Sequence, residues 1–193
     1  MQITFTKPAA PKSGVAVAFA FAGRKLAGLA ATLDEATGGS ITRAMEASRF
    51  EGKAGKSLTL ITPAGLPIDR LVLVGLGEPG KLDELGAQKA GGIAWAQVAG
   101  VNAKSALIIA DVTPESEFSA GDFAANVAYG SALRSYRFDK YRTKEKAEDK
   151  PQITKLSIAT DAASAAKKAY ATLEAVVEGV FFTRDLVSEP PNV

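Results

Sequence analysis

The feature that most constrains the fold is a run of seven apolar residues, Val15 to Phe21 (VAVAFAF), in which valine and phenylalanine alternate with alanine. A continuous apolar run with β-branched and aromatic members predicts a buried β-strand. The segment 2–7 alternates apolar and polar residues, which predicts an edge strand. Four further segments have strand composition, namely 57–62, 68–76, 104–110 and 152–160.

Stretches with helical periodicity separate these strands. They predict two short helices within 26–48, divided at Gly38-Gly39, and three longer helices at 82–101, 119–138 and 161–182. Ser119 and Asp161 are the expected N-caps of the last two. Strands that alternate with helices predict parallel crossovers, whereas the short connection at 63–65 predicts an antiparallel pair. The chain is therefore expected to be an α/β domain with a mixed six-stranded sheet.

Composition excludes several functional classes. The 193 residues include no histidine, which removes the commonest general base and the commonest zinc ligand, and no cysteine. The net charge of +2 is too balanced for a dedicated nucleic-acid domain. No apolar run reaches the length of about 18 residues that spans a bilayer, and no leader pattern opens the chain, so we expect a cytoplasmic protein without a membrane partner.

One motif invites a nucleotide-binding interpretation. Gly75 to Gly80 matches G-x-G-x-x-G between a predicted strand and a predicted helix. However, Pro79 lacks an N–H donor, Glu78 adds negative charge, and Asp111 lies about 30 residues beyond the loop, where a ribose-binding acid lies about 20 residues on. The motif favours a plain turn, with a nucleotide or ADP-ribose site as the alternative. The segment 52–57 resembles the end of a P-loop but leads into a strand, so we expect a turn with solvated lysines there.

A basic segment follows the predicted helix at 119–138. Residues 134–150 contain seven basic and four acidic residues, a net charge of +3, interleaved with Tyr136, Phe138 and Tyr141. Such a pattern favours a solvated loop, and binding of DNA or another partner is the alternative. The carboxylate pairs Asp34-Glu35 and Asp83-Glu84 predict helix capping or surface charge, and Trp95 is expected in the core.

Three segments together resemble one family, the cytosolic leucyl aminopeptidases, and specifically the N-terminal part of these two-metal enzymes. The segments are 71–77 (LVLVGLG), 130–144 (GSALRSYRFDKYRTK) and 183–193 (TRDLVSEPPNV). Their order and spacing agree with the family over essentially the whole chain. The third is the most specific, because it resembles the opening of the family's catalytic domain. Ser188 stands where the family usually has asparagine.

The resemblance implies a macro-domain-like three-layer α/β fold over 1–182. The segment 183–193 is then the truncated start of the interdomain linker and catalytic domain. Independently of the resemblance, residues 184–193, which contain Pro190-Pro191, are expected to be extended. The family's metal ligands and catalytic residues all fall downstream, so this chain is expected to hold no catalytic, cofactor-binding or metal-binding residue and to be inactive alone. The full-length protein would carry two manganese or zinc ions, act on peptides, and form a homo-hexamer through its own C-terminal catalytic domain.

Overall fold

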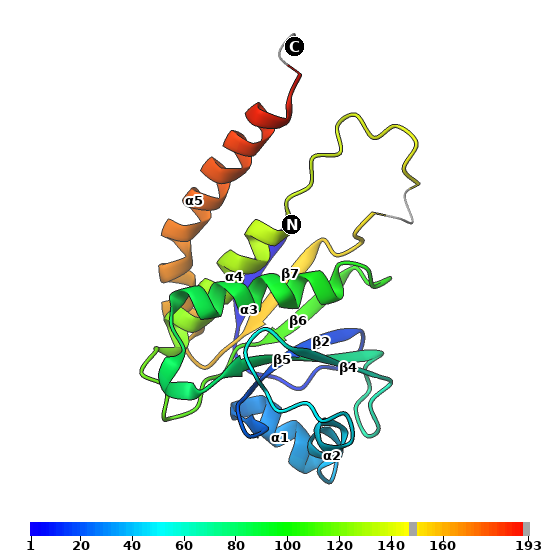
Figure 1. The fold of residues 1–193 in the computed structure, drawn as a ribbon, viewed down its shortest axis with the longest axis vertical. Helices are drawn as coiled ribbons and strands as arrows, with labels where there is room; N and C mark the ends of the chain where they lie inside the picture. Colours follow the sequence, from blue (N-terminus) through cyan, green and yellow to red (C-terminus); the bar gives the residue numbers. More distant parts are fainter. Residues whose placement is uncertain (147–149, 191–193) are drawn as a thin grey trace.

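A computed structural model of the chain describes residues 1–146 and 150–190. It shows a sheet between two layers of helices (Figure 1). The strands are β1 (Gln2–Thr6), β2 (Val15–Phe21), β3 (Lys25–Leu26), β4 (Ser57–Ile61), β5 (Arg70–Gly77), β6 (Ser105–Ile109) and β7 (Lys155–Ala159). The helices are α1 (Gly28–Ala36), α2 (Ser40–Ala47), the 3-10 turn η1 (Pro79–Lys81), α3 (Glu84–Val98), α4 (Ala120–Ser135) and α5 (Ala163–Ser188).

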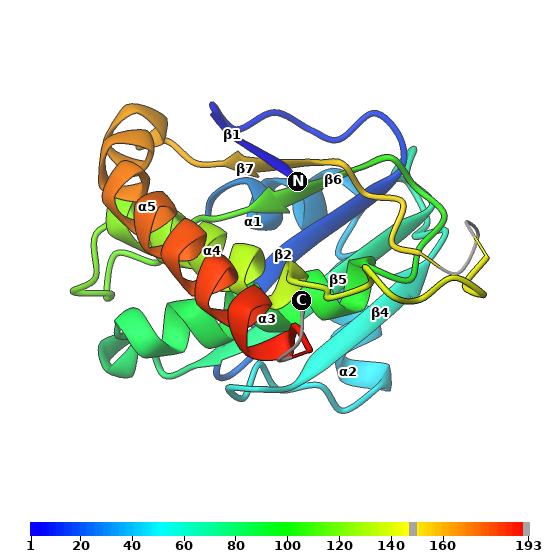
Figure 2. The ribbon, with the colours of Figure 1, turned by 90° about the horizontal axis from the view of Figure 1, so that it is seen from above.

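The sheet is mixed, and its strand order is β1-β7-β6-β2-β5-β4 (Figure 2). Neighbouring strands along this path are parallel, except that β4 pairs antiparallel with β5. The six expected strands, the edge position of β1 and the antiparallel pair are confirmed. The structure adds the two-residue strand β3, which pairs antiparallel with the end of β2.

The alternation within β2 explains how the two helical layers differ. Its valines and phenylalanines belong to the core beneath α3, α4 and α5. Its alanines belong to a second, smaller core with α1 and α2. All seven residues are buried. Successive strand side chains point to opposite faces, so a strand that is covered on both sides has to be apolar at every position.

Helices α3 and α4 approach each other through glycines. A Cβ atom added at Gly130 would lie 1.9 Å from the backbone oxygen of Gln88, and one added at Gly91 would lie 2.1 Å from the backbone oxygen of Val127. The Ser131 hydroxyl donates across the same contact to the Gly91 carbonyl at 3.0 Å. This backbone-to-backbone packing fixes where α4, and α5 beside it, can lie over the sheet.

The helix expected at 119–138 ends at Ser135, so residues 136–138 are not helical. Two further expectations, in the last helix, were also wrong. Helix α5 continues to Ser188, so residues 184–188 are helical and not extended. No proline occurs between 163 and 189, and the helix ends just before Pro190, which forces Glu189 into an extended conformation. The N-cap of α5 is Ala162 and not Asp161, and the Thr160 hydroxyl accepts the Ala162 N–H at 3.3 Å. The expected cap Ser119 is confirmed.

The close contact between α3 and α4 makes a sharp prediction for Gly130→Ala. Alanine normally stabilises a helix more than glycine does. At position 130, however, the alanine methyl group would collide with the Gln88 backbone. We expect a loss of about 3 kcal/mol in the free energy of unfolding, measured by urea denaturation. The matched control is Gly179→Ala in α5, where the added Cβ meets nothing within 4 Å and a gain of about 1 kcal/mol is expected. A neutral or stabilising Gly130→Ala would contradict the packing described.

Candidate functional site

The glycine motif at 75–80 serves packing within the domain. The Gly75 N–H donates to the Lys56 carbonyl at 2.8 Å, and the Gly77 N–H donates to the Gly52 carbonyl at 2.9 Å. A Cβ atom at Gly75 would lie 2.1 Å from the Lys53 oxygen. These glycines let the turn at 52–56 lie against the end of β5, and two amides that a phosphate would need are already used. The geometry supports the interpretation of this motif as a turn.

The carboxylates singled out by the sequence hold helix N-termini. Asp34 accepts the N–H groups of Ile41 and Thr42 at the start of α2, at 2.7 and 3.0 Å. Asp83 caps α3 by accepting the Gly86 N–H at 2.7 Å. Both therefore act as caps, as expected. Asp111 accepts an N–H in the first turn of α1, from Leu29 at 2.7 Å, and its burial raises the pKa of its carboxyl group.

Three of the seven basic residues in the segment 134–150 form ion pairs with carboxylates. Arg137 forms an ion pair with Glu145, whose hydrogen bond raises the pKa of the guanidinium. Lys150 pairs with Asp139 at 3.1 Å, and its hydrogen bond lowers the pKa of that carboxyl group. These pairs reduce the charge available to a nucleic acid and favour the interpretation of the segment as a loop. Glu148 and Asp149, which belong to the same segment, lie outside the described residues.

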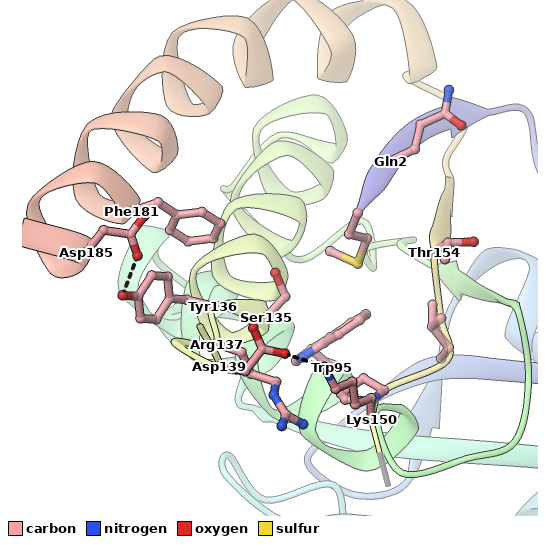
Figure 3. Close-up of a pocket in the computed structure, with 13 residues that line it drawn as sticks. Gln2, Trp95, Ser135, Tyr136, Arg137, Asp139, Lys150, Thr154, Phe181 and Asp185 are labelled. Carbon is pink, nitrogen blue, oxygen red and sulfur yellow. Dashed lines mark hydrogen bonds and ion pairs between the residues drawn. The ribbon is translucent and has the colours of Figure 1, made fainter. Parts of the chain in front are cut away.

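The two most distinctive sequence segments meet in space. Tyr136 donates its hydroxyl to Asp185 of α5 at 2.8 Å, and its ring lies 5.2 Å from the ring of Phe181, centroid to centroid (Figure 3). The Arg184 guanidinium lies 3.9 Å from the centre of the Tyr136 ring. Tyr136 therefore joins the chain that follows α4 to the end of α5.

Further along the same loop, two side chains hold the residue that follows α5. Lys140 forms an ion pair with Glu189 at 2.7 Å, and Tyr141 donates its hydroxyl to the same carboxylate. The hydrogen bond from Lys140 is the largest cause of a lowered pKa at Glu189. We call residues 136–141 the strap, because they tie the loop to the last turn of α5 from two sides.

A cavity of about 480 Å³ lies beside the strap (Figure 3). Trp95, Tyr136 and Phe181 line it with aromatic surface, and the Asp139–Lys150 ion pair lies at its wall. Trp95 is only 5% exposed, which confirms its expected burial. Because it is the only tryptophan in the chain, its fluorescence reports on one position, where the core meets this cavity.

The C-terminal half of α5 projects away from the sheet (Figure 1) and carries exposed apolar side chains. The exposed fractions are 45% for Val176, 65% for Phe182, 61% for Leu186 and 83% for Val187. We call these four residues the α5 stripe. Several exposed apolar side chains on one half of a helix indicate an interaction surface, in contrast to scattered single residues.

Within residues 1–146 and 150–190, no group of three or more acidic residues is placed to hold a metal ion. Among the helices in that part of the chain, none combines the length and apolar character needed to cross a bilayer.

Comparison with known proteins identifies the family. The model described as "Cytosol aminopeptidase family, N-terminal domain" matches residues 17–145, which is more than half of the chain. The chain belongs to this family. The strap segment lies within the matched region, whereas the end of α5 lies beyond it.

Curated cytosol aminopeptidase relatives match the chain from end to end. A probable cytosol aminopeptidase of Rhizobium meliloti (strain 1021) is 39% identical over 196 residues, and one of Caulobacter vibrioides is 36% identical over 196 residues. Each match covers 100% of this chain and 38% of the relative. The chain therefore spans well under half of the length of these cytosol aminopeptidases.

Solved structures share the fold. A tomato leucine aminopeptidase mutant superposes with a TM-score of 0.76 and 23% identity, covering 100% of this chain and 39% of that chain. The bottromycin maturation enzyme BotP in complex with Mn gives a TM-score of 0.66 and 21% identity, covering 91% of this chain and 32% of that chain. The expected architecture, a mixed sheet flanked by helices, is thus shared with these two solved structures.

The strap predicts how the end of α5 responds to a change at Tyr136. Tyr136→Ala removes the ring contact with Phe181 and the hydrogen bond to Asp185, so we expect the amides of the last turns of α5 to exchange hydrogen severalfold faster. Tyr136→Phe keeps the ring and loses one hydrogen bond, so its effect should be smaller. Hydrogen exchange read by mass spectrometry tests this, and unchanged exchange in Tyr136→Ala would show that the strap does not hold the helix.

Proposed function

We propose that this chain is the non-catalytic N-terminal domain of a leucyl aminopeptidase whose longer form removes N-terminal residues from peptides. The observation that carries the proposal is the end-to-end match to curated cytosol aminopeptidases of which the chain spans 38%. The family model for the N-terminal domain supports the same assignment. The proposal retains 1–182 as the domain and 183–193 as the start of the connection to the catalytic part.

The carboxylates of residues 1–146 and 150–190 form no cluster that fits a two-metal centre. Asp34, Asp83 and Asp111 each accept a backbone N–H at the start of a different helix. In the longer form, two divalent ions, manganese or zinc, would activate water and polarise the scissile carbonyl. No catalytic step is assigned to residues of this domain. Its contribution is to position the part that follows.

The proposal extends to the compartment, oligomeric state, substrate class and partner of the longer form. The resemblance of the segments 71–77, 130–144 and 183–193 to leucyl aminopeptidases supports a cytoplasmic protein that assembles as a homo-hexamer and acts on peptides. The same resemblance supports the C-terminal catalytic domain as the main partner of this chain.

Within this proposal, the α5 stripe is where the catalytic part packs. Phe182 and Leu186 are four residues apart, and Val176 and Val187 are eleven apart, so each pair shares one side of the helix. Burying these side chains against a following domain would be favourable, at roughly 25 cal/mol for each Å² removed from water. The strap would hold the helix end at a fixed angle for this contact.

The proposal is tested by comparing the peptidase activity of the 193-residue chain with that of a longer form. We expect manganese-activated hydrolysis of leucine p-nitroanilide by a version that continues through the C-terminal region, and none by the 193-residue chain. The physical reason is that the described carboxylates form no metal cluster. Activity of the short chain that survives repeated purification would contradict the proposal.

Docking through the α5 stripe is tested by Leu186→Asp and its matched control Ile61→Asp. Both residues are 61% exposed, but Ile61 lies on the edge strand β4. We expect Leu186→Asp to leave the melting temperature of the 193-residue chain unchanged, because the side chain is solvated there. In the longer form it should lower both the melting temperature and the hydrolysis rate, because a charge would enter a buried contact.

The control Ile61→Asp should leave the longer form unchanged. If the two variants behave alike in the longer form, or if Leu186→Asp has no effect there, the stripe is not the docking surface. That result would leave the catalytic assignment of the longer form standing.

A further inference from the structure

A second cavity, of about 530 Å³, lies between the turn at 52–56 and helix α3. It shares no lining residue with the cavity beside the strap. Four glycines line it, Gly55, Gly75, Gly86 and Gly92, together with the apolar side chains of Leu76 and Ile93. We call this cavity the glycine groove.

Packing does not require all of these glycines. Gly75 is needed because the Lys53 backbone lies against it. At Gly92, by contrast, an added Cβ atom would meet the Gly130 oxygen at 3.7 Å and the Arg134 Cβ atom at 3.8 Å, which are ordinary contacts. A glycine inside a helix is unfavourable relative to alanine. The absence of a side chain at 92 keeps the groove open at a cost to the helix.

Two cations flank the groove. Among the residues that the structure describes, Lys89 and Arg134 are the only charged residues that line it, and both are exposed. Lys89 lies one helical turn before Gly92. The Cβ atom of Arg134 lies 3.8 Å from the position that a Cβ atom at Gly92 would take. Both cations therefore border the part of the groove next to Gly92. Within the described residues neither forms an ion pair, whereas Lys53 pairs with Glu51 and Lys81 with Glu78.

The turn on the other side of the groove offers further donors. The N–H groups of Ala54 and Gly55 donate to no acceptor in the part of the chain that the structure describes. Gly55 has a φ of 78°, and both residues line the groove. Unused backbone N–H groups in such a turn favour an anion. Apolar walls, two unpaired cations and free N–H donors therefore point to one kind of ligand.

We propose that the glycine groove binds a small organic carboxylate with an apolar body. The carboxylate would lie between Lys89 and Arg134, and the apolar body would lie along Gly92 and Ile93. Two sources share this chemistry, a free apolar carboxylate and the C-terminal carboxylate of an apolar peptide. The inference goes beyond the proposed function and does not depend on it, because the groove lies within this domain.

The test is a titration of the 193-residue chain followed by nitrogen-proton correlation spectra. Sodium octanoate represents the free carboxylate, and N-acetyl-leucyl-leucine represents the peptide terminus. Octanamide and N-acetyl-leucyl-leucinamide are the matched neutral compounds. We expect shifts confined to the amides of the groove, and at least tenfold tighter binding of an acid than of its neutral amide. The acid that binds more tightly identifies the source.

Variants separate the roles of charge and space. Lys89→Gln/Arg134→Gln should weaken binding of the acid at least tenfold, whereas the control Lys104→Gln/Lys155→Gln removes the same charge from exposed residues elsewhere and should not. Gly92→Leu should abolish binding while both cations remain, because the leucine side chain fills the groove. Circular dichroism confirms that each variant folds.

Three results would overturn the inference. They are the absence of shifts with both acids, equal binding of the acids and their neutral amides, and undiminished binding by Lys89→Gln/Arg134→Gln. Because no step of this test uses catalysis, an inactive longer form would leave its outcome unaffected.

Discussion

The contact between α3 and α4 is the constraint on which the rest of the structure depends. Gly91 and Gly130 bring the two helix backbones together, and the Ser131 hydroxyl joins them across the contact. Helix α5 packs beside α4, so its direction follows from this contact. The strap begins at the end of α4, and the glycine groove is bordered by Lys89 of α3 and Arg134 of α4. The positions of the α5 stripe and of the glycine groove therefore both depend on the close packing at these two glycines.

Much of the fold could be predicted from the sequence because local patterns agree with the final structure. The alternation in Val15 to Phe21 specifies a strand covered on both faces, and Ser119 and Asp83 cap the helices that they precede. The end of α5 could not be predicted this way, because the sequence of the segment resembles a linker. The segment nevertheless contains no helix breaker before Pro190, and the helix continues to Ser188. Its helical state is supported by contacts with Tyr136 and Tyr141, which are about 50 residues distant in sequence.

The candidate sites show the same division. Sequence identified the segments 130–144 and 183–193 as distinctive but offered no sign that they touch, since a contact between distant segments leaves no periodic pattern. The sequence does not reveal the glycine groove either. In the sequence, the segments 52–57 and 75–80 resemble two separate phosphate loops, whereas in the structure they pack together and form one wall of the groove. The one feature in the sequence that points to the groove is Gly92, a glycine inside a predicted helix. Only the structure shows that packing does not require a glycine at this position.

We propose that this domain acts by presenting α5 to the part of the protein that follows. The decisive experiment compares hydrogen exchange of the 193-residue chain with that of the same residues in the longer form. We expect residues 176–188 and the strap to become markedly more protected in the longer form, while the exposed edge strand β4 exchanges equally in both. Equal exchange of α5 in the two forms would contradict it, because the stripe would then remain solvated in the complete protein.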